Sequence, residues 1–119
     1  MDQIIKLGLI MLLIDSIYIY FISNYFSNQI MQVQSTPMEV KKIGYVLTYM
    51  FLIAALYYFI VKENKSELDA FILGICIYGV YEFTNYSLLT NWTMKTSLID
   101  TVWGGILFAL TTKIIYSVN

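Results

Sequence analysis

The chain has 119 residues, of which 59% are apolar and only 13% are charged, and its formal net charge is −1. This composition excludes an ordinary soluble domain and indicates an integral membrane protein. The small net charge excludes a nucleic-acid-binding protein of the basic type, so we expect no nucleic-acid partner. Without histidine and with a single cysteine, Cys76, the chain cannot build a structural zinc site, which requires several nitrogen or sulfur ligands. We expect no cofactor and no dedicated metal centre, although carboxylates leave a hard-cation site open.

Four continuous apolar segments make up most of the chain. A hydrocarbon core of about 30 Å requires roughly 20 helical residues at 1.5 Å each. Barrel strands alternate over about ten residues, whereas these segments are longer and continuously apolar. We therefore predict an all-α fold, in which residues 1–119 form a single integral membrane bundle of four transmembrane helices with short connectors. The predicted helices are, in chain order, about 4–25, 43–62, 68–90 and 97–117.

The connectors give a weak signal for orientation. The longest, 26–42, contains the only proline, Pro37, in a polar turn. If the amino terminus is cytoplasmic, that side carries four lysines and the opposite side carries three. The positive-inside rule then favours cytoplasmic locations for both termini of a multi-pass membrane protein.

Each predicted helix has one face on which polar and small residues recur at intervals of three and four. We expect these faces to turn toward protein, because polar side chains are costly to expose to lipid. The faces comprise Gly8, Asp15, Tyr18 and Ile22 on the first helix; Tyr45, Thr48, Tyr49 and Leu52 on the second; Gly74, Tyr78, Tyr81, Glu82 and Asn85 on the third; and Asp100, Trp103, Gly104, Leu107 and Thr111 on the fourth.

Two hexamers near opposite ends of the chain match each other. Leu13–Tyr18 and Leu98–Trp103 each place an aspartate in an apolar segment, with a hydroxyl residue after it and a large aromatic residue three positions later. A charge at the bilayer centre costs about 2.5–3.5 kcal/mol on insertion scales. Together with Glu82 in the third segment, these aspartates are where we place the function. Because the two helices are antiparallel, a true repeat would be inverted in the membrane.

Helix direction places the three acids at related depths. Asp15, Glu82 and Asp100 all fall between mid-membrane and the surface that carries the 26–42 and 91–96 connectors. This predicts a half-buried polar pocket open to that surface and rimmed by Trp92, Trp103 and Tyr86. Trp92 also suits an interfacial anchor, which is the role we favour for it.

Carboxylates held together in a low dielectric cannot all ionise, so the pocket should bind a proton or share a cation. The alternative is that protonated carboxyls and neighbouring hydroxyls only tie one helix to another. We favour close packing over ligand contact for the pair Gly104–Gly105. We predict no catalytic residue and no metal ligand, and we assign as candidate ligand- or ion-binding residues Asp15, Tyr18, Tyr78, Tyr81, Glu82, Asn85, Asp100 and Trp103.

Three stretches carry a resemblance to a known family. Asp15-Ser16-Ile17-Tyr18, the stretch from Tyr78 to Asn85 and Asp100-Thr101-Val102-Trp103-Gly104 resemble a family of small, mainly bacterial, predicted membrane proteins of unknown function. Tyr18 stands where the family usually has tryptophan, and Glu82 where it usually has aspartate. The resemblance covers nearly the whole chain. It implies four helices and a shared polar site, and it implies no activity.

Three functions remain open on the sequence. The first, which we favour, is a transporter or channel for a proton, cation or small polar solute. The second is a structural protein that binds lipid or a partner helix. The third is an intramembrane lipid-modifying enzyme, which lacks a recognisable nucleophile or metal motif, so we lean against enzymatic activity. The expected partners are membrane lipid, the transported proton, cation or small polar ligand, and a second copy of the chain.

Overall fold

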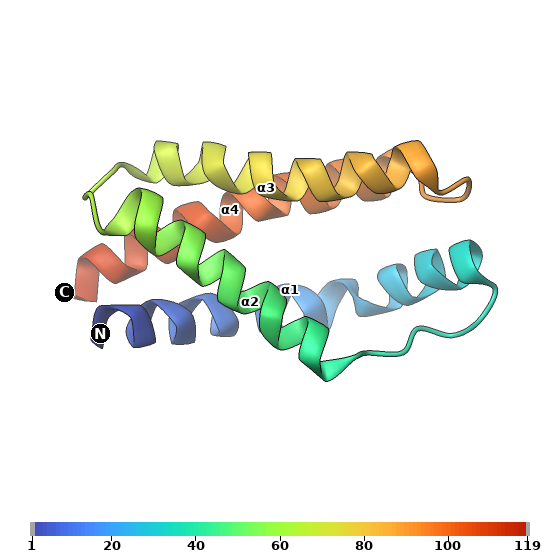
Figure 1. Cartoon of the computed structure of the whole chain (residues 1–119), viewed down its shortest axis with the longest axis horizontal. Coiled ribbons are helices and arrows are strands. Elements are labelled where there is room, and N and C mark those ends of the chain that lie inside the picture. Colours follow the sequence, from blue (N-terminus) through green and yellow to red (C-terminus); the bar gives the residue numbers. More distant parts are fainter. Residues whose placement is uncertain (1, 119) are drawn as a thin grey trace.

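A computed structural model describes residues 2–118, which form four α-helices in an antiparallel bundle (Figure 1). The prediction of an all-α, four-helix fold is confirmed. The start of α1, the end of α4 and the α2–α3 connector lie at one end of the bundle, while the end of α1 and the α3–α4 connector lie at the other. The helices are α1 (Asp2–Gln34), α2 (Lys42–Leu56), which continues into the π-helical turn η1 (Tyr57–Val61), α3 (Glu67–Leu88) and α4 (Met94–Val118).

Three of the described helical segments are long and apolar enough to cross a membrane. They are α1, α2 with η1, and α4. The fourth helix, α3, falls short of that criterion because its carboxyl-terminal half carries Glu82, Thr84 and Asn85 among tyrosines. Its outer face is nevertheless apolar, since Leu68, Val80 and Leu88 are all mostly exposed. An exposed apolar face of this kind suits lipid.

The first helix is longer than predicted. It continues to Gln34, beyond the expected end near residue 25, and so spans about 50 Å at 1.5 Å per residue. The expected connector 26–42 therefore shrinks to residues 35–41. The extension contains no glycine or proline, and the buried Gln29 holds it against the α3–α4 connector: its amide nitrogen donates to the Asn91 carbonyl at 2.7 Å. The helix ends at Ser35, whose φ of 63° is left-handed.

Helices α3 and α4 form the closest pair in the bundle. A Cβ atom added at Gly74 would lie 2.7 Å from the carbonyl carbon of Gly104 and 3.0 Å from the Cα of Gly105. A Cβ atom at Gly104 would meet the Cβ of Tyr78 at 2.7 Å. Small residues at these positions allow the two backbones to touch, as in other membrane helix pairs. The packing role predicted for Gly104 and Gly105 is confirmed.

Helix α2 makes sparser contacts with α1 than α4 makes with α1 or with α3. Its buried residues are Tyr49, Leu52 and Leu56. Figure 1 shows α2 inclined across the bundle and beginning well short of the end where α1 and α3 meet their connectors. Because of this short, inclined course, the extended segment 35–41 runs back along the bundle, and a hollow remains beneath it.

Candidate functional site

The two matching hexamers meet face to face on the antiparallel helices α1 and α4. The indole nitrogen of Trp103 donates to Oδ1 of Asp15 at 2.8 Å, and the hydroxyl of Tyr18 donates to Oδ1 of Asp100 at 3.2 Å. The Tyr18 and Trp103 rings stack, with centroids 4.3 Å apart and planes 4° apart. Each aspartate is thus held by the aromatic residue of the other hexamer. We call the two hydrogen-bonded contacts, Trp103 with Asp15 and Tyr18 with Asp100, the reciprocal pair.

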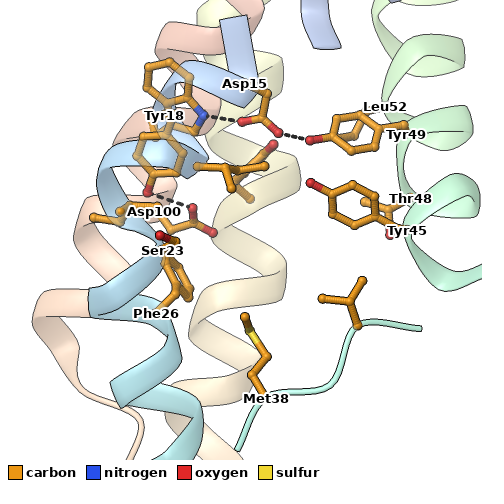
Figure 2. Close-up of a pocket in the computed structure, with 15 residues that line it drawn as sticks. Asp15, Tyr18, Ser23, Phe26, Met38, Tyr45, Thr48, Tyr49, Leu52 and Asp100 are labelled. Carbon is orange, nitrogen blue, oxygen red and sulfur yellow. Dashed lines mark hydrogen bonds between the residues drawn. The ribbon is translucent and has the colours of Figure 1, made fainter. Parts of the chain in front are cut away.

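A third donor reaches the reciprocal pair from α2. The hydroxyl of Tyr49 donates to Oδ2 of Asp15, so both oxygens of that carboxyl are occupied and α1, α2 and α4 are joined at one side chain (Figure 2). Asp15 is 7% exposed and Tyr49 is 8% exposed, so this junction lies inside the bundle. Since α2 is otherwise loosely packed, the Tyr49 hydroxyl is one of the few polar ties that hold it.

We expect Tyr49→Phe to lower the stability of the bundle by about 1–2 kcal/mol, because a hydrogen bond to a carboxylate is lost while the ring is kept. Thermal unfolding in detergent, followed by circular dichroism, measures the change. Tyr20→Phe is the matched control, because Tyr20 is 78% exposed and loss of its hydroxyl should not change the stability. Equal unfolding temperatures for the two variants would contradict a stabilising role of the hydrogen bond between Tyr49 and Asp15.

The third acid occupies a separate, closed position. Glu82 is fully buried, and its Oε1 accepts from the indole nitrogen of Trp92 at 3.0 Å. Its Oε2 has no hydrogen-bond partner among the described residues. Glu82 and Asp100 are close enough to influence each other, so the carboxyl groups of α3 and α4 form a neighbouring pair. The anchor role predicted for Trp92 is wrong, because Trp92 is only 3% exposed and binds Glu82 inside the protein.

Trp92→Phe is expected to destabilise the protein by about 1–3 kcal/mol, because it leaves both oxygens of a buried carboxyl without a donor. Adding Glu82→Leu in the same chain should restore most of the loss, since removing both partners of a buried polar contact can be nearly neutral. The four unfolding temperatures form a double-mutant cycle. Additive losses in that cycle would show that the Trp92–Glu82 contact contributes nothing.

A cavity of about 530 Å³ lies between α1 and α2 and reaches the reciprocal pair. Figure 2 shows Asp15 and Asp100 on one side of this space, with Tyr45 and Tyr49 of α2 opposite them and Met38 of the 35–41 segment at one end. The cavity therefore extends toward the connector side, as predicted, but the predicted polar lining is wrong, because most lining side chains are apolar or aromatic, and of the three expected rim residues only Trp103 lines it. Its walls are mostly apolar and aromatic, and the principal lining side chains are Asp15, Tyr18, Ile22, Phe26, Met38, Val40, Tyr45, Thr48, Tyr49, Leu52, Tyr78, Asp100 and Trp103.

A second hollow of about 370 Å³ adjoins the first on the α3 side of α2. Both are lined by Thr48, Leu52, Tyr78 and Asp100. Asp100 therefore lies between the two hollows, although the residue is only 8% exposed. The wall that the hollows share is built from α2, α3 and α4.

The structure brings five of the eight predicted site residues to the cavity: Asp15, Tyr18, Tyr78, Asp100 and Trp103. Of the other three, Glu82 is buried next to Asp100 and does not line the cavity. Tyr81 lines the second hollow but is 54% exposed. Asn85 lines neither hollow, and Tyr86, the expected rim residue, is 44% exposed and outside both.

Sequence reasoning turned one face of α2 toward the bundle interior but assigned none of its residues to the site. Tyr45, Thr48 and Tyr49 recur at helical spacing, so their shared face was visible, but their hydroxyls gave no reason to place them beside Asp15. Met38 and Val40 could not be assigned, because nothing in the sequence indicates that the connector folds back over the cavity.

The buried acids have only neutral hydrogen-bond partners among the described residues: Tyr18, Tyr49, Trp92 and Trp103. All seven lysines of the chain are exposed. A buried charge without a compensating partner is strongly unfavourable, and no lysine is among the hydrogen-bond partners of these carboxyls.

The fold and the site together define a small helical membrane protein with buried acidic residues beside an aromatic cavity. The chain belongs to the family described as "Predicted membrane protein (DUF2177)", whose model matches residues 2–117. The resemblance seen in the sequence is thereby confirmed over nearly the whole chain. No curated protein and no solved structure gives a significant match to it.

Proposed function

We propose that this protein is a membrane carrier for a cation or proton, with Asp15 and Asp100 as the groups that bind it. The observation that supports this most directly is the pair of buried carboxyls at the wall of one cavity, held by neutral donors, while every lysine is exposed. Intramembrane acids in such surroundings commonly form ion or proton pathways.

The arrangement of the helices supports a carrier more than a fixed pore. The cavity reaches the acids from the connector side, and the close α3–α4 contact closes the bundle on one flank. The loosely packed α2 is the element free to move, and it separates the two hollows that share Asp100. Movement of α2 would change the exposure of Asp100 to the two hollows, and a moving wall beside a binding site is a feature of carriers.

Proton flux in proteoliposomes tests the proposal. A pH-sensitive dye is trapped inside the vesicles, and a pH gradient is imposed with K⁺, Na⁺ or tetramethylammonium outside. The dye signal records the decay of the pH gradient. Wild-type protein is expected to accelerate the decay at least tenfold over empty vesicles with one of these cations. Asp15→Asn/Asp100→Asn should return the rate to that of empty vesicles, while Asp69→Asn, at an exposed position on α3, should not. Identical rates for wild type and the double variant would contradict the proposal.

A structural role is the second candidate, and a specific observation favours it. The carboxyl of Asp15 joins three helices, and that of Asp100 joins α4 to α1. If these contacts are the purpose of the acids, the carboxyls should be needed for stability and not for flux. Thermal unfolding of Asp100→Asn, measured beside its flux, separates the two functions.

A further inference from the structure

We propose that the cavity binds an organic cation, an ammonium group beside Asp15 and Asp100 with its hydrocarbon portion against the aromatic walls. This inference deepens the proposed function by naming the class of cation, and it rests on that function. Three observations support it: the chemistry of the cavity walls, the Asp100 oxygen that no aromatic donor occupies, and the size of the cavity.

The walls combine two features that an organic cation needs. Six aromatic side chains line the cavity, and they come from all four helices: Tyr18, Phe26, Tyr45, Tyr49, Tyr78 and Trp103. The face of an aromatic ring attracts a cation and also accepts hydrocarbon, and quaternary ammonium groups are recognised in this way. Because the remaining lining is mainly Ile, Leu, Met and Val, a ligand with an apolar body gains from burial there.

One acid has an oxygen that no aromatic donor occupies. Tyr18 donates to Oδ1 of Asp100, and Oδ2 receives no tyrosine or tryptophan donor from the described residues, while the Glu82 carboxyl lies beside Asp100. Figure 2 shows that second oxygen directed away from Tyr18, toward the side of the cavity that α2 lines. Asp100 is more than nine-tenths buried, so its charge acts in a low dielectric, where attraction for a cation is strongest. An anion would be repelled by both aspartates.

A bare inorganic cation fits the cavity less well. Calcium requires six to eight oxygen ligands and magnesium a near-octahedral set. Residues 2–118 contain no group of three acidic, histidine or cysteine side chains placed to hold a metal ion. The oxygen donors at the cavity are two carboxyls and scattered hydroxyls, whereas the apolar surface is extensive. The volume of about 530 Å³ lies within the range of cavities that enclose drug-sized ligands.

The two tryptophans of the chain make the test direct. Trp103 lines the cavity, whereas Trp92 contacts Glu82 away from it. In Trp92→Phe, Trp103 is therefore the sole indole reporter. Benzyltrimethylammonium is titrated into this variant in maltoside detergent, with K⁺ at equal concentration as the ionic control. Its neutral isostere neopentylbenzene, with carbon in place of nitrogen, controls for apolar partitioning.

We expect saturable quenching of Trp103 by benzyltrimethylammonium and none by K⁺. Asp100→Asn should raise the half-saturating concentration at least tenfold, equivalent to about 1.4 kcal/mol, while Asp69→Asn leaves it unchanged. Because Trp92→Phe is itself destabilising, the upward shift of the unfolding temperature by the same ligand is also measured with wild-type protein. Equal binding of neopentylbenzene, or binding that ignores Asp100→Asn, would overturn the inference.

A choline lipid headgroup carries the same ammonium chemistry as a free solute. The titration is repeated in nanodiscs of phosphatidylglycerol with and without phosphatidylcholine. Weaker probe binding in the presence of phosphatidylcholine identifies the headgroup as the source, and unchanged binding identifies a free solute. Both results support an ammonium site.

Failure of this inference can be distinguished from failure of the proposed function. If benzyltrimethylammonium does not bind but proton flux with K⁺ or Na⁺ still requires Asp15 and Asp100, the carrier stands and the organic class is wrong. If neither binding nor flux depends on these residues, both proposals are wrong.

Discussion

Asp100→Asn is expected to abolish cation-dependent flux while leaving the protein as stable as the wild type or more stable. Asparagine keeps the Oδ1 acceptor for the Tyr18 hydroxyl and removes a buried charge that has no cationic partner. Removing such a charge costs no ion pair and relieves desolvation. The free oxygen that we assign to the ligand is replaced by an amide NH₂, which repels a cation. Flux should therefore fall at least tenfold.

Thermal unfolding in detergent at neutral pH and vesicle flux are measured on the same preparations. Asp100→Leu completes the comparison, because it also removes the acceptor and leaves the Tyr18 hydroxyl without its partner. We expect this variant to lose about 1–3 kcal/mol of stability as well as flux. If Asp100→Asn were as destabilised as Asp100→Leu, the charge itself would be structural, and the tie between α1 and α4 would become the leading function.

Gly74→Ala is expected to destabilise the bundle by about 3 kcal/mol, at the upper end of the usual cost of overpacking. The added methyl would meet the backbone of Gly104 and Gly105, which cannot rotate aside as a side chain can. Helices α3 and α4 must therefore separate, and the separation shifts Asp100 relative to α3. Reversible unfolding in detergent measures the loss.

Gly44→Ala is the matched control for this prediction. Gly44 lies at the start of α2, and a Cβ atom there would find nothing within 4 Å. Alanine is the better helix former, so this change should be neutral or stabilising by up to about 1 kcal/mol. Gly79→Ala, whose Cβ would make ordinary contact with Thr101 at 3.6 Å, should fall between the two. A Gly74→Ala protein as stable as Gly44→Ala would contradict the close contact.

The sequence predicted the elements of this fold better than their ends. Apolar length alone identified four helices, because lipid leaves a backbone few other ways to satisfy its hydrogen bonds. The extension of α1 to Gln34 was missed, since polarity near Asn28 suggested a loop. Only the structure reveals that Gln29 is buried against Asn91, a contact between residues 62 positions apart.

The acidic residues of the candidate site could be predicted from the sequence, but the partners that surround them could not. Helical spacing placed Asp15 and Asp100 on inward faces, and the matching hexamers drew attention to Tyr18 and Trp103. Which aromatic residue meets which acid depends on the offset between two antiparallel helices, and no local pattern encodes that offset. Trp92 lies in the α3–α4 connector, and no local pattern shows that this connector brings its indole back to Glu82, although only ten positions separate them.

The contacts of the three acids also set an order for assembly during synthesis. Glu82 receives its donor ten residues later in the chain, whereas Asp15 obtains the Tyr49 hydroxyl after 34 residues and the Trp103 indole after 88. Asp100 emerges last and finds Tyr18 already in place. When α1 is complete, the Asp15 carboxyl has neither of its two donors, and Tyr49 of α2 is the first of them to be synthesised.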